Sequence, residues 1–261
     1  MRSAVELAAR PDFAVRTVFC RDDHRGWSAA EHRTEYNLVL VRRGRFRRRI
    51  AGVVTDVDTT VGYVSLPGDE EHFAHPAGGD VCTAVSYSGR LWWSVAGEDH
   101  RPELYVDAAL EFAHRRFLAA AGIGDTDFAL AETLVTLLGV ALRRTVEMRA
   151  ADRVLVSRAR EAILEDHPAS AGLLPLSTLL SVSPYRLSRA FSRHLGTSLT
   201  RYRNRVRVGR ALDRLEAGEP NLAVLAADLG FADQAHLTRT VREHVGHTPA
   251  ALRHLLAQAG P

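Results

Sequence analysis

The chain has 261 residues, of which 46% are hydrophobic, so it can bury a sizeable core in one or two domains. All 34 basic residues are arginine, and two cysteines, Cys20 and Cys82, are too few for a disulfide framework. No run approaches the roughly 20 apolar residues of a membrane-spanning helix, and the first residues lack the apolar core of a signal peptide. These features exclude membrane-embedded and disulfide-stapled proteins and predict a cytoplasmic location.

Charge is unevenly distributed along the chain. Residues 151–261 contain 15 arginines against 10 acidic residues, whereas residues 1–150 contain 19 arginines against 21 acidic residues. A basic C-terminal part is typical of proteins that attract the phosphates of nucleic acid. An excess of five charges does not identify a partner by itself, so the motifs must decide.

The N-terminal region consists of short extended segments. Apolar and β-branched runs, separated by glycine, proline and aspartate, predict strands at residues 13–20, 37–41, 46–50, 53–58, 61–66, 72–75 and 81–87. Residues 21–35 are polar and predict a loop, and Arg42-Arg43-Gly44 predicts a turn. Short strands at close spacing favour an antiparallel barrel or sandwich.

A small molecule bound in such a barrel would contact alternate residues of its strands. The candidate lining residues are Tyr36, Leu38, Leu40 and Phe46. Trp92 and Trp93 follow the last strand and either close the barrel or pack beneath the next helix. Packing is the favoured interpretation.

Thiols and imidazoles in this region suggest a metal site, with zinc or another divalent ion as the cofactor. The candidate ligands are Cys20, His24, His72, His75 and Cys82, because thiolates and imidazoles suit zinc. Their spacing is not a recognised zinc signature. Two alternatives stay open: a reversible disulfide between the cysteines, or two buried apolar cysteines beside ordinary loop histidines. The last of these is favoured.

Helical periodicity begins after residue 100, at residues 103–121 and 128–149. The second segment carries an apolar stripe that is wider than one neighbour needs, made of Leu130, Leu134, Leu137, Leu138, Ala141 and Leu142. We therefore expect one further partner for this segment. The alternative is that both helices pack on their own barrel. Residues 153–166 predict one more helix, and residues 167–172 a loop.

One helical pattern then occurs twice within residues 172–256. Leu187, Arg189, Phe191, His194 and Gly196 recur 50 residues later as Leu237, Arg239, Val241, His244 and Gly246. Each copy reads as helix, tight turn, helix, a helix-turn-helix.

The caps of the second helix in each copy are clear in the sequence. Ser183 before Pro184, and Asp233 in the second copy, offer an oxygen to free amides at the start of a helix. Gly196 and Gly246 can take the left-handed conformation that ends one. The turns fall at Ser181-Val182 and at Gly230. The buried faces are predicted to include Leu173, Leu176 and Leu180, and Leu222, Leu225 and Ala226.

Polar side chains remain on the outward face of each second helix. They are Tyr185, Arg186, Ser188, Arg189 and Arg193 in the first, and Gln234, Ala235, His236, Thr238, Arg239 and Arg242 in the second. Arginine can bind guanine bidentately, glutamine can do the same to adenine, and methyl groups can contact thymine. A solvated helix face is the usual fate of one such run, but the capped repeat favours DNA reading.

An amphipathic helix is predicted between the copies, ended by Gly218. It carries six arginines that we expect to meet phosphate, namely Arg201, Arg203, Arg205, Arg207, Arg210 and Arg214. Such a helix could hold the two copies at the roughly 34 Å that separates successive turns of the major groove.

The C-terminal region resembles the DNA-binding domain of AraC/XylS transcription regulators. The resemblance covers about 105 residues and rests on residues 176–191, residues 202–215 and Leu225-Ala226-x-x-x-Gly230-Phe231-x-Asp233-Gln234, continuing to residues 246–249 and Arg253. It implies base contacts from Tyr185, Ser188 and Arg189, and from Gln234, Ala235, Thr238 and Arg239. The sequence departs from the family at Ser177, Ala235, Leu237 and Val241.

The N-terminal region is similar to the cupin-type sensor barrels that precede such domains. The similarity rests on Val41-Arg42-Arg43-Gly44, on residues 61–68 and on His72. In the regulators it resembles, the helices after the barrel pair subunits, so the resemblance implies a homodimer. Metal-binding cupins carry a His-x-His element with a glutamate, which is missing here, so no metal ligands carry over.

Together these features predict an α+β protein with three regions. Residues 1–100 form a small antiparallel β-barrel, cupin-like, that senses an effector; residues 101–150 form two linker or dimerisation helices; and residues 151–261 form an all-α domain with two helix-turn-helix motifs. The predicted function is sequence-specific transcription regulation, and the expected partners are double-stranded DNA, an unknown small-molecule effector, a second copy and RNA polymerase. The alternative is a metal-dependent cupin enzyme fused to a DNA-binding module, although the sequence carries no catalytic signature.

Overall fold

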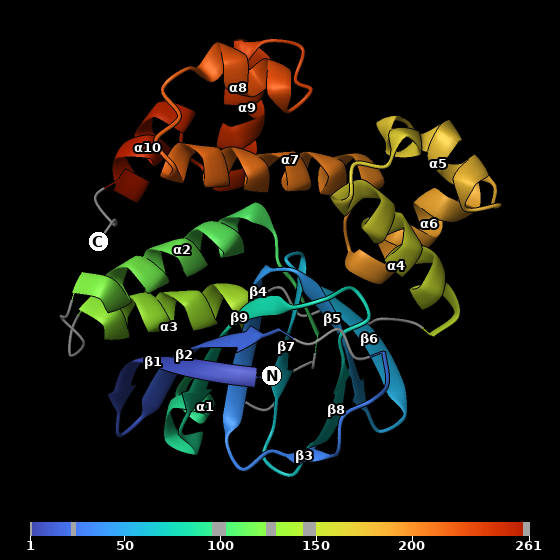
Figure 1. The fold of residues 1–261 in the computed structure, drawn as a ribbon. Helices are drawn as coiled ribbons and strands as arrows, with labels where there is room; N and C mark the ends of the chain where they lie inside the picture. The colour runs from blue at the N-terminus through green and yellow to red at the C-terminus, as the bar shows by residue number, and fades with distance from the viewer. Residues whose placement is uncertain (1, 22–24, 96–102, 124–128, 143–149, 258–261) are drawn as a thin grey trace. The chain divides into compact units, whose positions relative to one another are not determined.

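The computed structural model describes residues 2–21, 25–95, 103–123, 129–142 and 150–257 (Figure 1). The chain divides into two compact units. The sheet unit comprises residues 1–106 and 117–145, and the helical unit comprises residues 107–116 and 146–261. The predicted middle region, residues 101–150, is therefore shared between the two units.

One antiparallel sheet forms the sheet unit. Among the described residues, nine strands follow the order β1-β2-β9-β4-β7-β6-β5-β8-β3, and a tenth pairs with β7. Their bounds are β1 Arg2–Arg10, β2 Phe13–Cys20, β3 Glu31–His32, β4 Tyr36–Arg43, β5 Arg45–Ile50, β6 Val53–Asp58, β7 Val61–Ser65, β8 Glu70–Ala74, β9 Asp80–Tyr87 and β10 Glu103–Tyr105. The seven predicted strands are confirmed with small shifts at their ends, and Gly44 makes the predicted turn with a φ of 80°.

Three strands were not predicted. One is the two-residue β3, which lies within the predicted loop of residues 21–35 and pairs with β8. β1 pairs with β2 along the whole length of β1, although residues 2–10 show no pattern of apolar residues that is typical of a strand. Residues 103–105 were predicted to begin a helix, which is wrong: they pair with β7, with Glu103 opposite Tyr63. The hydroxyl of Thr55 donates to the Glu103 carboxylate at 2.7 Å, and Leu104 is fully buried, so tertiary packing overrides the helical pattern.

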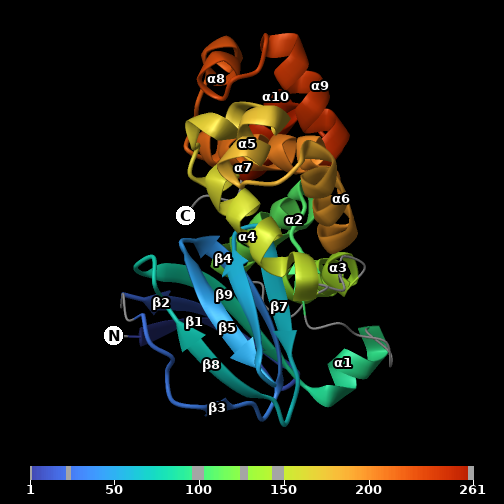
Figure 2. The ribbon, with the colours of Figure 1, turned by 90° about the vertical axis from the view of Figure 1, so that its right-hand side faces the viewer.

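The sheet is strongly curled (Figure 2). β1 and β3 lie at opposite ends of the strand order, yet Arg2 Nη1 of β1 lies 2.7 Å from Glu31 Oε2 of β3. An ion pair between the two end strands requires the sheet to bend back on itself. The concave side therefore encloses a core that includes Phe46, Tyr63 and Phe73.

Both faces of β4 are buried. Leu38 and Leu40 are 1% exposed on one face, while Val39 and Val41 belong to the concave core on the other. Tyr36 stacks on Trp92 with ring centroids 4.9 Å apart, and Trp92 itself is buried in α1 (Gly89–Val95). Trp92 thus packs, as the favoured interpretation held, whereas Trp93 is exposed.

The helices that follow the sheet are α2 (Ala108–Ile123) and α3 (Ala129–Leu142). The apolar stripe of α3 is buried within the chain at Leu130, Leu134, Leu137, Leu138 and Ala141. The chain itself covers these residues, so the stripe does not call for a further partner, and the homodimer stays a prediction. Residues 143–149, at the end of the predicted helix, lie outside the described residues.

The helical unit has seven α-helices and one short 3-10 helix in its described residues beyond α3. They are α4 (Ala150–Leu164), η1 (Pro168–Ala171), α5 (Leu173–Leu179), α6 (Pro184–Leu195), α7 (Leu199–Glu216), α8 (Leu222–Asp228), α9 (Gln234–Val245) and α10 (Pro249–Ala257). Figure 1 shows α5 and α6 near one end of the rod-like α7, and α8 and α9 near the other. The α+β architecture with two helix-turn-helix motifs is confirmed.

None of the described helices combines the length and the apolar character that a bilayer crossing requires.

Candidate nucleic-acid interface

The helices α6 and α9 begin and end as predicted. The hydroxyl of Ser183 accepts a hydrogen bond from the amide of Arg186 at 3.2 Å, and the carboxylate of Asp233 accepts one from the amide of His236 at 2.7 Å. Each helix has 12 residues and ends at a left-handed glycine. Both caps satisfy amides that a helix start otherwise leaves without partners.

The two turns differ by one residue. Four residues separate α5 from α6, whereas five separate α8 from α9, so the copies are offset by 49 residues before the turn and by 50 after it. In the first register Ser181 is equivalent to Gly230. Both are left-handed, with φ of 55° and 70°. The turn therefore needs this backbone conformation even where the residue has a side chain.

The inner faces of both helices are buried. In α6 they are Leu187, Ala190, Phe191, His194 and Leu195, and in α9 they are Leu237, Thr240 and Val241. Phe191 packs edge-on against Tyr202 of α7, with ring centroids 5.0 Å apart. The prediction that Leu173 is a core residue is wrong. Leu173 is exposed because it is the first residue of α5, and the buried residues of this helix are Leu176 and Ser177.

The predicted reading residues lie mostly on the outer faces. Eight of the eleven are exposed, namely Tyr185, Arg186, Arg189, Arg193, Gln234, Ala235, Arg239 and Arg242. Ser188, His236 and Thr238 are partly buried. The structure thus presents one polar surface on each helix, as the sequence predicted.

On α6 the exposed side chains interact with one another. Arg189 Nη1 donates to the Tyr185 hydroxyl at 2.6 Å, and its guanidinium lies 5.4 Å from the centre of that ring. Arg193 Nη2 donates to Asp152 of α4 at 3.2 Å. Arg189 is therefore held in one orientation, while Arg193 also braces α6 against α4.

On α9 one predicted reader has a local role. The amide of Ala232 donates to His236 Nδ1 at 3.4 Å, and the His236 ring packs edge-on against Phe231 with centroids 5.4 Å apart. The imidazole stabilises the turn before α9, in addition to any outward contact. Gln234 and Arg239 remain exposed on this helix.

The arginines of α7 were all predicted to meet phosphate, and this is wrong for Arg205. It is 3% exposed, and its Nη2 lies 2.9 Å from Glu111 of α2. Three others form ion pairs at the surface: Arg201 with Glu243, Arg210 with Asp166, and Arg214 with Glu219 and Asp228. Sequence alone could not show that acidic residues from distant segments contact this helix.

The comparisons with known proteins agree with this geometry. Residues 176–254 match a family described as a helix-turn-helix domain. The chain is also 29% identical over 101 residues to the arabinose operon regulatory protein of Escherichia coli K12. This segment is an AraC/XylS-type helix-turn-helix domain. The match covers 37% of the chain and spans about a third, 35%, of the Escherichia coli relative.

Two solved structures are similar to this chain. The C-terminal domain of AraT, a response regulator from Geobacillus stearothermophilus, is 28% identical over 38% of this chain and 83% of its own, with a TM-score of 0.35. ToxT from Vibrio cholerae O395 is 11% identical and is aligned over 95% of this chain and 99% of its own, with a TM-score of 0.36.

The predicted metal residues lie in the sheet unit, and the structure divides them. Cys20 and His75 are close to each other, and Cys82 lies nearby on β9. His72 Nδ1 lies 3.0 Å from the Ser28 carbonyl and its Nε2 lies 3.4 Å from Glu70, so its ring is engaged elsewhere. His24 lies outside the described residues.

The sequence interpretation missed Asp80. His75 Nε2 lies 3.0 Å from Asp80 Oδ1, and this contact, followed by one with Cys20, raises the pKa of His75 to about 9. Burial, followed by the neighbouring Asp80, raises the pKa of Cys82. Asp80 and Cys82 are two residues apart on one strand and so share a face, a spacing that could have signalled the aspartate.

A cavity of about 310 Å³ lies on the concave side of the sheet. Of the four predicted lining residues, only Phe46 lines it; Tyr36, Leu38 and Leu40 do not, and Asn37 and Val39 take their place. The predicted face of β4 was wrong because both faces of this strand are buried, so hydrophobicity does not distinguish them. Arg2, Arg16 and Arg33 bring positive charge to the same cavity.

Proposed function

We propose that the protein is a sequence-specific DNA-binding transcription regulator. One observation carries the proposal: two capped helices of equal length, α6 and α9, each bury one face and expose a polar one, and both motifs flank the same helix, α7. A pair of helix-turn-helix motifs can enter successive major-groove turns, roughly 34 Å apart. The expected partner is therefore double-stranded DNA.

Arg189 and Arg239 occupy equivalent positions on the two helices and are the principal candidates for base contacts. Both are exposed, and a guanidinium can bind both acceptors of a guanine edge. Gln234 at the start of α9 can bind adenine in the same bidentate manner. Arg186 and Arg242, also exposed, suit phosphate contacts that fix orientation on the duplex.

The sheet unit would supply the signal. Its cavity of about 310 Å³ is lined by aromatic and apolar side chains together with arginines, a combination that suits a small effector. Such an effector can alter transcription only by binding two conformations of the protein with different affinity. A homodimer and a contact with RNA polymerase belong to the same proposal. The dimer surface would lie away from the buried stripe of α3.

Binding selection followed by single substitutions tests the DNA proposal. Sites would first be selected by the full chain from fragmented genomic DNA, and affinity would then be measured by fluorescence anisotropy on the best site and on a scrambled duplex. We expect Arg189→Ala and Arg239→Ala each to weaken binding to the selected site by about 1 to 3 kcal/mol, with much smaller losses on the scrambled duplex.

Arg47→Ala is the matched control, because it removes the same charge from an exposed position on β5 of the sheet unit. This substitution should change neither the affinity for the selected site nor that for the scrambled duplex. Equal losses on selected and scrambled DNA would assign both arginines to phosphate and remove the reading role. Failure of the unmodified chain to enrich any sequence would overturn the proposal as a whole.

A further inference from the structure

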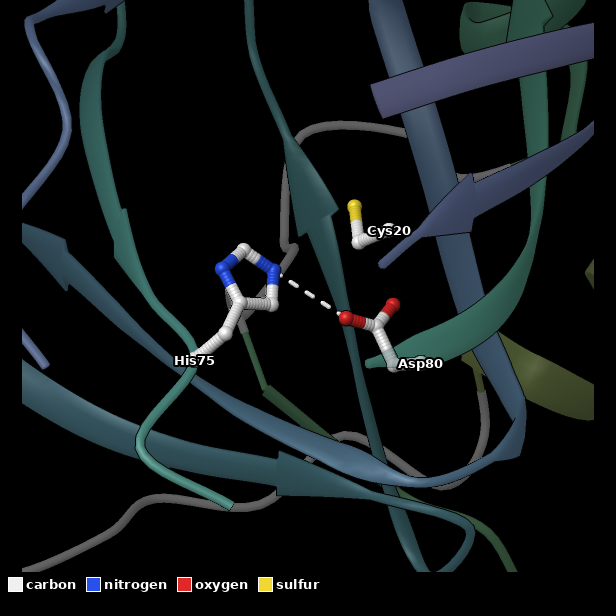
Figure 3. Close-up of side chains that lie close together, drawn as sticks. All are labelled: Cys20, His75 and Asp80. Carbon is white, nitrogen blue, oxygen red and sulfur yellow. Dashed lines mark ion pairs between the residues drawn. The ribbon is translucent and has the colours of Figure 1, made fainter. Parts of the chain in front are cut away.

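Three donor side chains of different chemistry converge at one place in the sheet unit. Cys20 ends β2, Asp80 begins β9, and His75 follows β8 (Figure 3). Cys20 and Asp80 are direct partners in the antiparallel register of β2 and β9, so their side chains project from the same face of the sheet. The fold thus fixes the backbone of two of the three donors.

The distances suit a small ion after modest adjustment. One donor atom from each residue lies within 4.8 Å of the others, and His75 Nε2 is 3.0 Å from Asp80 Oδ1. Tetrahedral zinc with bonds of about 2.0 to 2.3 Å places its donors roughly 3.6 Å apart. The side chains need to move by about an ångström, without a change of backbone, to reach that spacing.

A fourth donor is adjacent. Cys82 Sγ lies 3.0 Å from Asp80 Oδ2, and Cys82 is two residues beyond Asp80 on the same strand face. Cys82 and Asp80 are 4% exposed, and His75 is 7% exposed. The four side chains also line the 310 Å³ cavity, so an ion can be reached from it and would be largely shielded from bulk water.

We propose that Cys20, His75 and Asp80 bind a divalent cation of the zinc type, with Cys82 as the fourth ligand. Thiolate, imidazole and carboxylate donors together favour zinc over calcium or magnesium, which prefer oxygen alone. Each cysteine would give its thiol proton to solvent on becoming a ligand, and the His75 imidazolium would release a ring proton in the same way. The site goes beyond the proposed function and lies wholly in the sheet unit, so it can be tested without DNA.

Cobalt is the probe for this site, because it substitutes for zinc and reports thiolate ligation by charge-transfer absorption. The metal-free full chain would be titrated with cobalt and then with zinc, under a reductant that does not chelate. We expect one equivalent of cobalt with a thiolate band that zinc abolishes. Cys20→Ser, His75→Gln and Asp80→Asn should each weaken cobalt binding by more than the roughly 10- to 100-fold that loss of a supporting second-shell group costs.

His72→Gln is the matched control, since this histidine lies on neighbouring β8 and contacts Ser28 and Glu70 instead. It should leave the titration unchanged. Cys82→Ser should reduce the thiolate band by about half, as expected for one of two thiolates lost. Cobalt binding that is absent, that lacks a thiolate band, or that is weakened equally by His72→Gln would overturn the proposal.

A second measurement needs no variant and so does not depend on the variants folding. Alkylation of Cys20 would be followed by mass spectrometry on the unmodified chain with and without zinc. We expect zinc to slow it several-fold, because a bound thiolate is a poor nucleophile. Equal rates would refute ligation by Cys20, and a Cys20–Cys82 disulfide formed on mild oxidation in the presence of zinc would favour a redox pair instead. Neither result bears on DNA binding, which is measured separately.

Discussion

The two helix-turn-helix motifs share a local design but differ in how the rest of the chain supports them. α6 and α9 have the same length, a side-chain cap at one end and a left-handed glycine at the other. The first motif packs against α4 and relies on the aromatic pair Phe191 and Tyr202. The second shares one continuous core with α7, α10 and two residues of α2, Ala108 and Phe112.

This difference shows which features belong to the repeated unit and which belong to its surroundings. The caps and turns recur because they satisfy the backbone of each motif locally. The cores do not recur, since Phe191 is equivalent to Val241, and Ala108 and Phe112 of α2 enter only the core of the second motif. We therefore expect substitutions at equivalent positions to have unequal effects, and the predictions below test this from the largest effect to the smallest.

Truncation of the equivalent core residues should separate the two motifs most clearly. Phe191 and Val241 are both fully buried, but the phenyl group leaves the larger cavity. We expect Phe191→Ala to lower the free energy of unfolding by about 3 to 5 kcal/mol and Val241→Ala by roughly 2 kcal/mol. Chemical denaturation of the full chain measures both. Equal losses would mean that the second motif depends on its side chain as much as the first.

The support from α2 should be specific to the second motif and to α7. Glu111 pairs with buried Arg205 at 2.9 Å and with Arg115 at 2.6 Å, and Arg115 also contacts Asp213 and Glu216. Glu111→Ala leaves a buried guanidinium without this carboxylate, so we expect a loss of about 3 kcal/mol in the free energy of unfolding.

Asp213→Ala is the control within the same network. The Asp213 side chain is 66% exposed, so its ion pair with Arg115 should contribute less than about 1 kcal/mol. Hydrogen exchange should localise the effect of Glu111→Ala to the amides of α7 and α9. Faster exchange in α6 to the same extent would contradict the unequal support of the two motifs.

Substitutions at the two turn residues, Gly230 and Ser181, should change the free energy of unfolding in opposite directions. Gly230→Ala places a side chain at a φ of 70°, with its Cβ 3.1 Å from Arg207 Nη2, and should cost roughly 1 to 2 kcal/mol. Ser181→Gly relieves the same backbone strain at a φ of 55° but increases the freedom of the unfolded chain, so we expect a net gain of only about 0.5 kcal/mol. Thermal unfolding compares the two, and a loss on Ser181→Gly would show that the serine is not strained.

The features that were predicted correctly from the sequence depend on residues that are close together along the chain. Helix ends are marked by local hydrogen bonds and backbone conformation at Ser183, Asp233, Gly196 and Gly246. The short apolar and β-branched runs in the sequence located seven strands. The outer faces of α6 and α9 followed from the same periodicity. Local rules suffice where the partner of each group lies within one helical turn.

What the sequence could not predict depends on partners that are distant along the chain. Residues 103–105 became a strand because β7 offers them a free edge, and the cavity-lining face of β4 could not be chosen because both faces are buried. Arg205 is withdrawn from the surface by Glu111, which precedes it by 94 positions. Asp80 was missed because it meets Cys20, which precedes it by 60 positions, only through the pairing of β2 with β9.

The smallest expected effect is a pH dependence confined to the second motif. His244 lies in the last turn of α9, where burial, followed by the charge of Arg201, lowers its pKa; Arg205 acts in the same direction, while Glu243 and Asp107 oppose them. The fold therefore favours the neutral imidazole. The neutral imidazole of His244 contributes its full stabilisation above the pKa of histidine in the unfolded chain, about 6.5. This stabilisation is lost as the pH falls from there through the lower pKa of the folded protein.

His244→Gln should accordingly flatten the fall in the free energy of unfolding between pH 8 and pH 5, a range set by the unfolded value of about 6.5. His254→Gln, at an exposed position on α10, is the matched control and should leave the slope as it is. Because carboxylates titrate in every variant, only the difference between the variants is informative. A slope that His244→Gln leaves unchanged would mean that the helix dipole, which favours a charged histidine at this end of α9, offsets burial and the arginines.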